Sequence, residues 1–119
     1  MNRIALLLAV TLGLLLAACG DPLPQDKIAY AGDWRSRDMR LLITPDGRCE
    51  YRRRREGGST SSIRAPIVRF EGDNFVVGLG MISTTFVVSK PPHLVGGQWH
   101  MTVDGVDLIR FGPSDEIQA

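Results

Sequence analysis

The sequence predicts an all-β fold: a small antiparallel meander of about seven strands, barrel-like or strongly curved, that follows a helical N-terminal segment. Three observations support this prediction. From Met39 onward, apolar and polar residues alternate with a period of two, which is typical of strands. Turn sequences rich in Gly, Asp, Asn and Pro interrupt this alternation at short intervals. Nothing after Met39 has the apolar spacing of an amphipathic helix.

The chain begins with a segment typical of a secretory signal peptide. Arg3 precedes an apolar run from Ile4 to Leu16, and small residues follow the run. The run is shorter than the roughly 20 apolar residues that cross a bilayer. It ends in Leu16-Ala17-Ala18-Cys19, which resembles the lipobox of bacterial lipoproteins. In that family a signal peptidase cuts before the cysteine after its thiol has received a diacylglycerol.

This resemblance implies that Cys19 carries a covalent diacylglycerol and an N-acyl chain, and no other cofactor is expected. Such chains anchor a protein to a membrane without inserting its domain. The resemblance also implies a place in the bacterial cell envelope, facing the periplasm. Gly20 stands where the family's inner-membrane retention signal usually has an aspartate, and Asp21 comes one residue later. The outer membrane is therefore favoured over the inner one.

Four segments are expected along the chain: a signal peptide at 1–18, a lipidated anchor and linker at 19–28, a β domain at 29–111 and a tail at 112–119. The linker contains two prolines and is expected to be an extended spacer. Cleavage leaves 101 of the 119 residues, which suits one small domain. Without Arg3, the mature chain holds 13 basic and 13 acidic residues. A neutral total argues against nucleic acid as a partner.

Cys49 is the other cysteine of the chain, so an intrachain disulfide is excluded once Cys19 is lipidated. A lone cysteine in a secreted protein either pairs with a partner chain or is buried. Free cysteine is among the most buried residue types, and the buried interpretation is favoured here.

The first hairpin is predicted over residues 39–55, around the turn Pro45-Asp46-Gly47. A three-residue loop pairs Ile43 with Cys49 and keeps one face apolar, whereas a two-residue loop would set Ile43 opposite Glu50. The apolar pairing therefore selects the three-residue loop and places Cys49 on the core face. The same register pairs Thr44 with Arg48, Leu41 with Tyr51 and Arg40 with Arg52.

A second hairpin is predicted over residues 63–81, around Gly72-Asp73-Asn74. Two loop lengths both give apolar pairings, so its register stays open. A further strand is predicted over residues 84–89, ending before Pro91-Pro92, because a central strand does not tolerate proline. The core candidates in these strands are Val68, Phe70, Phe75, Val77, Leu79, Met81, Phe86 and Val88.

The last hairpin has the clearest turn signal, Asp104-Gly105, between residues 99–103 and 106–110. A two-residue turn sets Trp99 opposite Arg110 on the core side, where a guanidinium over the indole contributes about 0.5 to 2 kcal/mol. The same register pairs Val103 with Val106, Met101 with Leu108, Thr102 with Asp107 and His100 with Ile109.

Two short sites, Gly32-Asp33-Trp34 and Leu108-Ile109-Arg110, resemble the lipocalin and calycin pattern. In that pattern a Gly-x-Trp tryptophan on the first strand is covered by an arginine from the last strand. The resemblance implies that Trp34 plugs one end of a barrel and that Arg110 covers it. Trp99 joins this signature through its pairing with Arg110. A barrel this small tends to fill with its own side chains, which argues against a ligand cavity.

The run Arg52-Arg53-Arg54-Arg55 is the most unusual stretch of the mature chain. On a strand, Arg52 and Arg54 share one face, and the hairpin register sets Arg52 opposite Arg40. These three arginines are candidate binding residues because guanidinium groups bind oxyanions bidentately. The expected partner is another envelope protein or an envelope polyanion such as lipopolysaccharide. The alternative is a solvated strand end whose charge is neutralised by Glu50 and Glu56.

The sequence has no enzyme signature, and no catalytic or metal-binding residue is expected. His93 and His100 are predicted in a loop and on an outward strand face, without the spacing of a zinc site. No serine stands in a nucleophile elbow. Gly78 and Gly80 leave one side of a strand smooth, which fits a bend that closes a barrel better than a ligand surface.

Together these features predict a membrane-anchored, non-catalytic interaction or assembly module. Two alternatives are a calycin-like binder of a small apolar ligand and an inhibitor of an envelope-directed hydrolase. Whether the core is filled by side chains or contains a cavity distinguishes the ligand binder from the interaction module, because a filled core leaves no room for a ligand.

Overall fold

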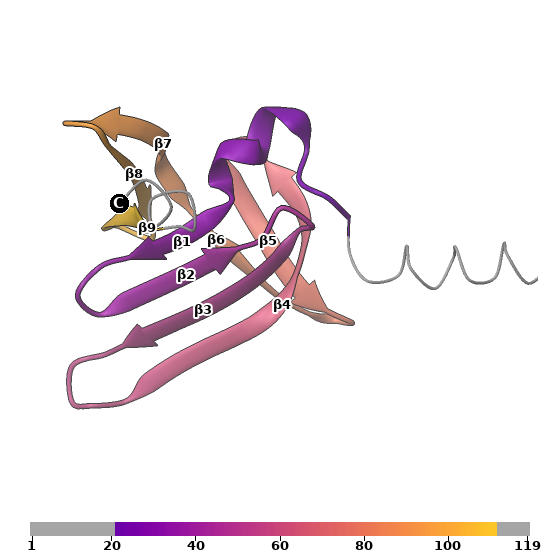
Figure 1. The fold of residues 1–119 in the computed structure, drawn as a ribbon. Helices are drawn as coiled ribbons and strands as arrows, with labels where there is room; N and C mark the ends of the chain where they lie inside the picture. The colour runs from indigo at the N-terminus through magenta and orange to yellow at the C-terminus, as the bar shows by residue number, and fades with distance from the viewer. Residues whose placement is uncertain (1–20, 112–119) are drawn as a thin grey trace, which may run out of the picture.

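A computed structural model describes residues 21–111; the predicted signal peptide, Cys19 and the tail at 112–119 lie outside these residues. The described chain forms nine strands in a single antiparallel sheet, which curls into a half-barrel (Figure 1). The all-β, strongly curved prediction is thus confirmed, with nine strands where about seven were expected. No helix within this range is long and apolar enough to cross a membrane. The elements are η1 (Gln25–Tyr30), β1 (Gly32–Arg35), β2 (Met39–Ile43), β3 (Arg48–Arg54), β4 (Thr60–Glu71), β5 (Asn74–Leu79), β6 (Ile82–Phe86), β7 (Val88–Val95), β8 (Gln98–Val103) and β9 (Val106–Phe111).

The strand order is β6-β5-β4-β3-β2-β1-β9-β8-β7, so the first and last strands pair in the middle of the sheet. The two edge strands, β6 and β7, are consecutive in the chain and are joined by Val87. The N–H of Val87 donates to Oδ1 of Asp104 at 2.9 Å, and the N–H of Asp104 donates to the carbonyl of Val87 at 2.8 Å. These bonds tie the β6–β7 link to the β8–β9 turn.

The first and last hairpins have the predicted registers. Ile43 lies opposite Cys49 in the first hairpin, and Val103 lies opposite Val106 in the last. The N–H of Thr44 donates to the carbonyl of Arg48 at 2.9 Å, which closes the expected three-residue loop. Both registers follow from keeping apolar residues on one face of the pleat.

The second hairpin corrects three of the predicted core residues. Glu71 pairs with Asn74, so its loop contains two residues. A register shift between Ile67 and Arg69 interrupts the alternation of β4, and Ile67 becomes the buried residue there. The hairpin between β5 and β6 projects beyond the core, which leaves its tip in solvent. The wrongly assigned core residues are Val68, Leu79 and Met81, which are 49%, 63% and 102% exposed.

The strand predicted over 84–89 is divided at Val87, and β7 continues through Pro91 and Pro92. The expectation that the strand ends before these prolines is wrong because β7 is an edge strand. Its pairing with β8 shifts register on both sides of Lys90, before His93. Proline is tolerated where one side of a strand carries no ladder partner.

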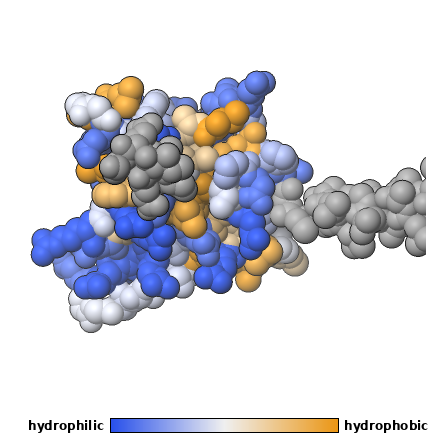
Figure 2. All heavy atoms as spheres, in the orientation of Figure 1, coloured by the Kyte–Doolittle hydropathy of each residue, from blue (hydrophilic) through white to orange (hydrophobic). Residues whose placement is uncertain are grey.

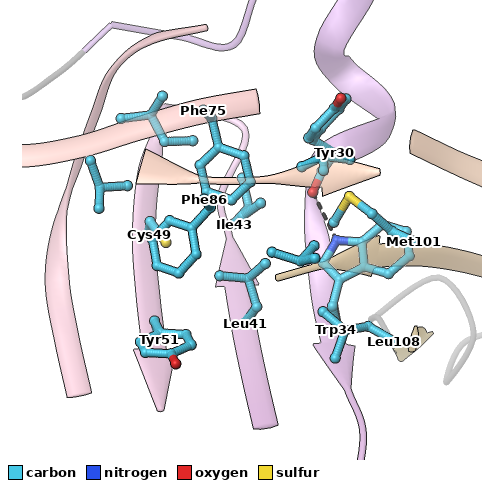
Figure 3. Close-up of a cluster of buried hydrophobic side chains, with 14 of the residues drawn as sticks. Tyr30, Trp34, Leu41, Ile43, Cys49, Tyr51, Phe75, Phe86, Met101 and Leu108 are labelled. Atoms are coloured by element: carbon cyan, nitrogen blue, oxygen red, sulfur yellow. Dashed lines mark hydrogen bonds between the residues drawn. The ribbon is translucent and has the colours of Figure 1, made fainter. Parts of the chain in front are cut away.

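The concave side of the sheet is filled by side chains from all parts of the chain (Figure 3). Trp34 is completely buried beside Met101 and Leu108, which come from β8 and β9. The rings of Phe75 and Phe86 stack with centroids 5.0 Å apart. An aromatic cluster of this kind stabilises a core beyond its buried area.

The segment before the sheet is docked onto it, not extended as a spacer. The N–H of Leu23 donates to the carbonyl of Pro45 at 3.0 Å, and the Leu23 side chain is buried. A methyl group at Gly47 would collide with the carbonyl oxygen of Asp21, so glycine allows this close approach. The spacer prediction for 19–28 is therefore wrong from Asp21 onward, since a buried leucine and η1 anchor this segment.

Candidate functional site

Exposed arginines gather on the outer face of β1 to β4, and we call five of them the arginine face. In β3, Tyr51 points into the core, and its neighbour Arg52 therefore points outward with Arg54. The same alternation in β1 places Arg35 on the side opposite to the buried Trp34. Figure 2 shows a concentration of hydrophilic residues around the end of the sheet at which β3 ends and β4 begins. The arginine face consists of Arg35, Arg40, Arg52, Arg54 and Arg64, and all five are exposed.

Three of these arginines form a row across neighbouring strands. Arg35 lies opposite Arg40, and Arg40 lies opposite Arg52, as predicted for the second pair. Ser62 of β4 continues the row beyond Arg52. Neighbouring strands are about 4.8 Å apart, and like charges directly opposed on them destabilise a sheet. The row therefore gains from any anion that binds across it.

Asp33 neutralises one end of the row. Its carboxylate accepts hydrogen bonds from Arg35 at 2.7 Å and from Arg40 at 3.0 Å. Burial raises the pKa of Asp33, but the hydrogen bonds from both arginines outweigh burial and hold this pKa below its usual value. The hydrogen bond to Asp33 also raises the pKa of Arg40.

At the other end of the row, no carboxylate within residues 21–111 forms an ion pair with Arg52. Glu50 forms an ion pair with Arg64 at 2.8 Å. Neither Arg52 nor Arg54 forms an ion pair with a carboxylate anywhere in residues 21–111. The interpretation in which Glu50 and Glu56 neutralise the arginine run therefore finds no ion pair to support it within this range. Two adjacent guanidinium groups remain available for a ligand.

Two open hollows lie on this face. The larger has a volume of about 570 Å³ and is lined by Arg35, Arg40, Arg52 and Arg54, among others. The smaller has a volume of about 240 Å³ and shares Arg40 and Arg52 with it. The predicted binding residues Arg40, Arg52 and Arg54 therefore line one continuous cationic surface.

Sequence reasoning missed Arg35 and Arg64 as members of this surface, and Asp33 as its internal anion. The alternation around Trp34 would have placed Asp33 and Arg35 on the outer face. Their position beside Arg40 depends on the β1–β2 register, for which the turn at residues 36–38 gives no strong signal.

We expect Asp33→Asn to lower the free energy of unfolding by about 1 kcal/mol at pH 7, because Arg35 and Arg40 would then repel each other without an anion between them. The pKa of Asp33 is lower in the folded state. Its stabilisation is therefore complete above the unfolded value of about 3.9 and is lost as the pH falls through the folded value. Urea denaturation at pH 7 and pH 2 measures the difference, and a difference that persists at pH 2 would contradict this account.

The residues of the calycin-like signature are brought together in the middle of the sheet. Trp34 and Arg110 are partners across β1 and β9. The indole Nε1 of Trp34 donates to the carbonyl of Tyr30 at 2.8 Å. Arg110 lies with its stem against Gly32 and its guanidinium 5.1 Å from the ring centre of Trp99. The predicted contact between Trp99 and Arg110 is thus present, and the family resemblance stays a prediction.

The remaining candidates have structural roles in the described chain. Gly80 has a φ of 62° in the β5–β6 turn, and a methyl group on Gly78 would lie 2.8 Å from the carbonyl oxygen of Ile82. Nδ1 of His100 lies 3.1 Å from the Asp107 carboxylate, and its ring centre is 6.1 Å from that of His93. No group of three or more His, Cys, Asp or Glu residues within 21–111 is placed to hold a metal ion.

The buried interpretation of Cys49 is confirmed. Its side chain is completely buried on the core face of β3 as a free thiol. Burial, with a smaller effect from Glu50, raises the pKa of this thiol to about 12. At neutral pH the group is an unreactive part of the core.

Comparison of the chain with protein-family models, with curated proteins and with solved structures finds no match.

Proposed function

We propose that this chain is a lipid-anchored, non-catalytic interaction module of the bacterial cell envelope. Its anchor is the lipid on Cys19, and its binding surface is the arginine face. The observation that carries the proposal is the directly opposed pair Arg40 and Arg52, in which Arg52 forms no ion pair within residues 21–111. A surface that costs stability in the free protein points to an anionic partner that relieves the repulsion.

The charge distribution supports a specific site within this face. Asp33 already occupies the β1 side of the row, so a partner carboxylate or phosphate is best accommodated by Arg52 and Arg54. Guanidinium groups bind such oxyanions bidentately. Because the total charge of the mature chain is near zero, attraction comes from this local cluster.

The shape of the face favours a macromolecule over a small anion. The hollows are open, and the cationic side chains spread over four strands. A small ligand is normally held in a concave pocket that covers most of its surface. We therefore propose an acidic surface of another envelope protein as the partner. Binding of an apolar molecule inside the sheet has no support, because Phe75, Phe86 and Trp34 fill the interior.

Photo-crosslinking in cells of the native host tests this proposal. A photoreactive residue at Thr60, which lies opposite Arg54, is expected to give a defined crosslink to an envelope protein. The charge-reversed variant Arg52→Glu/Arg54→Glu is expected to reduce this crosslink at least tenfold, because two attractive contacts become repulsive. Both side chains are exposed, so the variant is expected to fold.

The matched control is Arg69→Glu/Lys90→Glu, which changes the net charge by the same amount at exposed positions outside the arginine face. The crosslink should survive in this variant. Equal crosslinking by the two double variants would overturn the role of the arginine face.

A further inference from the structure

The docked N-terminal segment determines which end of the domain faces the anchor. Asp21 lies against Gly47 in the β2–β3 turn, and Leu23 is bound to Pro45 of the same turn. Cys19 is only two residues before Asp21, and two residues span at most about 7 Å. If Cys19 is lipidated, this turn is held next to the bilayer.

Large apolar side chains are exposed near the same end. Leu79, Met81 and Ile82 form the tip of the β5–β6 hairpin and are 63%, 102% and 79% exposed. Met81 occupies the turn itself, where a polar residue or glycine is usual. An apolar group of this kind on a soluble surface marks an interaction site.

Backbone contacts connect the base of the β5–β6 hairpin to the β2–β3 turn, against which Asp21 lies. The N–H of Ile67 donates to the carbonyl of Gly47 at 2.7 Å. Ile67 is paired with Val77, which is only two residues before Leu79 on β5. In Figure 1 the tip lies at the same end of the molecule as the indigo segment with which the described chain begins, and β3 runs toward the opposite end, where its arginine run lies. The tip is therefore on the side of the domain that faces the anchor.

Further apolar surface continues from the docked segment. Val68 is 49% exposed beside Pro22 and Pro24, and together they line a shallow groove of about 290 Å³. The exposed β7–β8 tip, with Leu94 and Val95, lies at another end of the molecule (Figure 1). The apolar surface beside the docked segment thus differs from the β7–β8 tip, because the lipid anchor holds it close to a bilayer.

We propose that the β5–β6 tip, formed by Leu79, Met81 and Ile82, inserts into the interfacial layer of the membrane that holds the lipid anchor. This proposal rests on the proposed lipidation of Cys19. A second, protein-borne contact limits rotation of the domain about its anchor. It directs the arginine face away from that membrane, where it meets a partner protein and not the headgroups of its own bilayer.

Fluorescence quenching in vesicles tests the membrane contact. The full chain is produced with its signal peptide in a bacterium that processes lipoproteins, then reconstituted in phosphatidylethanolamine and phosphatidylglycerol vesicles. An NBD label is attached through Met81→Cys or, as the matched control, Leu94→Cys; both sites are exposed apolar hairpin tips. The parent chain, whose Cys49 is buried, measures background labelling.

Nitroxide-bearing lipids are expected to quench the label at position 81 at least twofold and to leave the label at position 94 almost unchanged. Equal quenching at both positions, or none at position 81 in chains that float with the vesicles, overturns the contact and leaves the lipid anchor intact. Chains whose N-terminal peptide carries no lipid by mass spectrometry overturn both the anchor and the contact. With the label at position 81, quenching should be the same whether the chain carries Arg52→Glu/Arg54→Glu or the native arginines. The membrane contact is thus tested separately from the arginine face, whose test is the crosslink to a partner protein.

Discussion

Replacement of Trp34 by alanine is expected to lower the free energy of unfolding by about 3 to 5 kcal/mol. The indole is completely buried at the centre of the sheet, where β1 pairs with β2 on one side and β9 on the other. Its removal leaves a cavity between the two halves of the sheet. It also removes the hydrogen bond to the carbonyl of Tyr30, which joins η1 to β1. A small domain is stable by only about 5 to 15 kcal/mol, so a loss of this size removes a large part of its stability.

Urea denaturation followed by circular dichroism measures this loss without depending on tryptophan fluorescence. The matched control is Trp99→Ala, which removes the same side chain from a half-exposed position near the start of β8. It is expected to cost about 1 to 2 kcal/mol, since mainly the contact with the Arg110 guanidinium is lost. Equal losses in the two variants would contradict a central role for Trp34.

Titration of Cys49 is expected to destabilise the wild-type protein by about 4 kcal/mol between pH 9 and pH 12. Burial raises the pKa of the thiol from 9.0 to about 12 in the folded state. The unfolded chain therefore loses this proton first, and the stability that is complete below pH 9 is lost as the pH rises through the folded value. Denaturation with urea across this range measures the slope.

Cys49→Ala removes the ionisable group and should flatten the stability curve between pH 9 and pH 12. The pKa of Tyr30 is also raised to about 12, by burial first and then by Asp73 and Asp26, so part of the alkaline loss remains in this variant. Tyr30→Phe should remove that remainder. Parallel pH curves for the wild type and Cys49→Ala would show that the thiol is not buried from solvent.

The local sequence pattern was sufficient to predict the register of those hairpins in which the apolar alternation and the turn residues agree. In the first hairpin, only the three-residue loop keeps Ile43 opposite Cys49, and the register therefore follows from the sequence. The burial of Cys49 and the opposed pair Arg40 and Arg52 then follow from the same register. The alternating pattern also predicted the curved all-β class. A sheet with one apolar face must cover that face, and because no helix follows, the sheet covers it by curving over itself.

Features that depend on which strands become neighbours were decided only by the tertiary structure. The bulge at Ile67 turned Val68 outward, and the edge position of β7 made room for Pro91. The turn at Gly47 became a docking site for Asp21, which converted an expected spacer into part of the domain.

The residues of the candidate site likewise form two groups: those that the sequence predicted and those that only strand pairing brought to the site. Arg40, Arg52 and Arg54 were placed on one face by the two-residue period of a single hairpin. Arg35 and Asp33 joined them only through the β1–β2 register, and Arg64 only through that of β3 and β4. In the first and last hairpins, sequence by itself determined which face each side chain occupies, because no bulge interrupts the two-residue period there. Tertiary structure decided which faces adjoin, because strand pairing depends on the packing of the whole core.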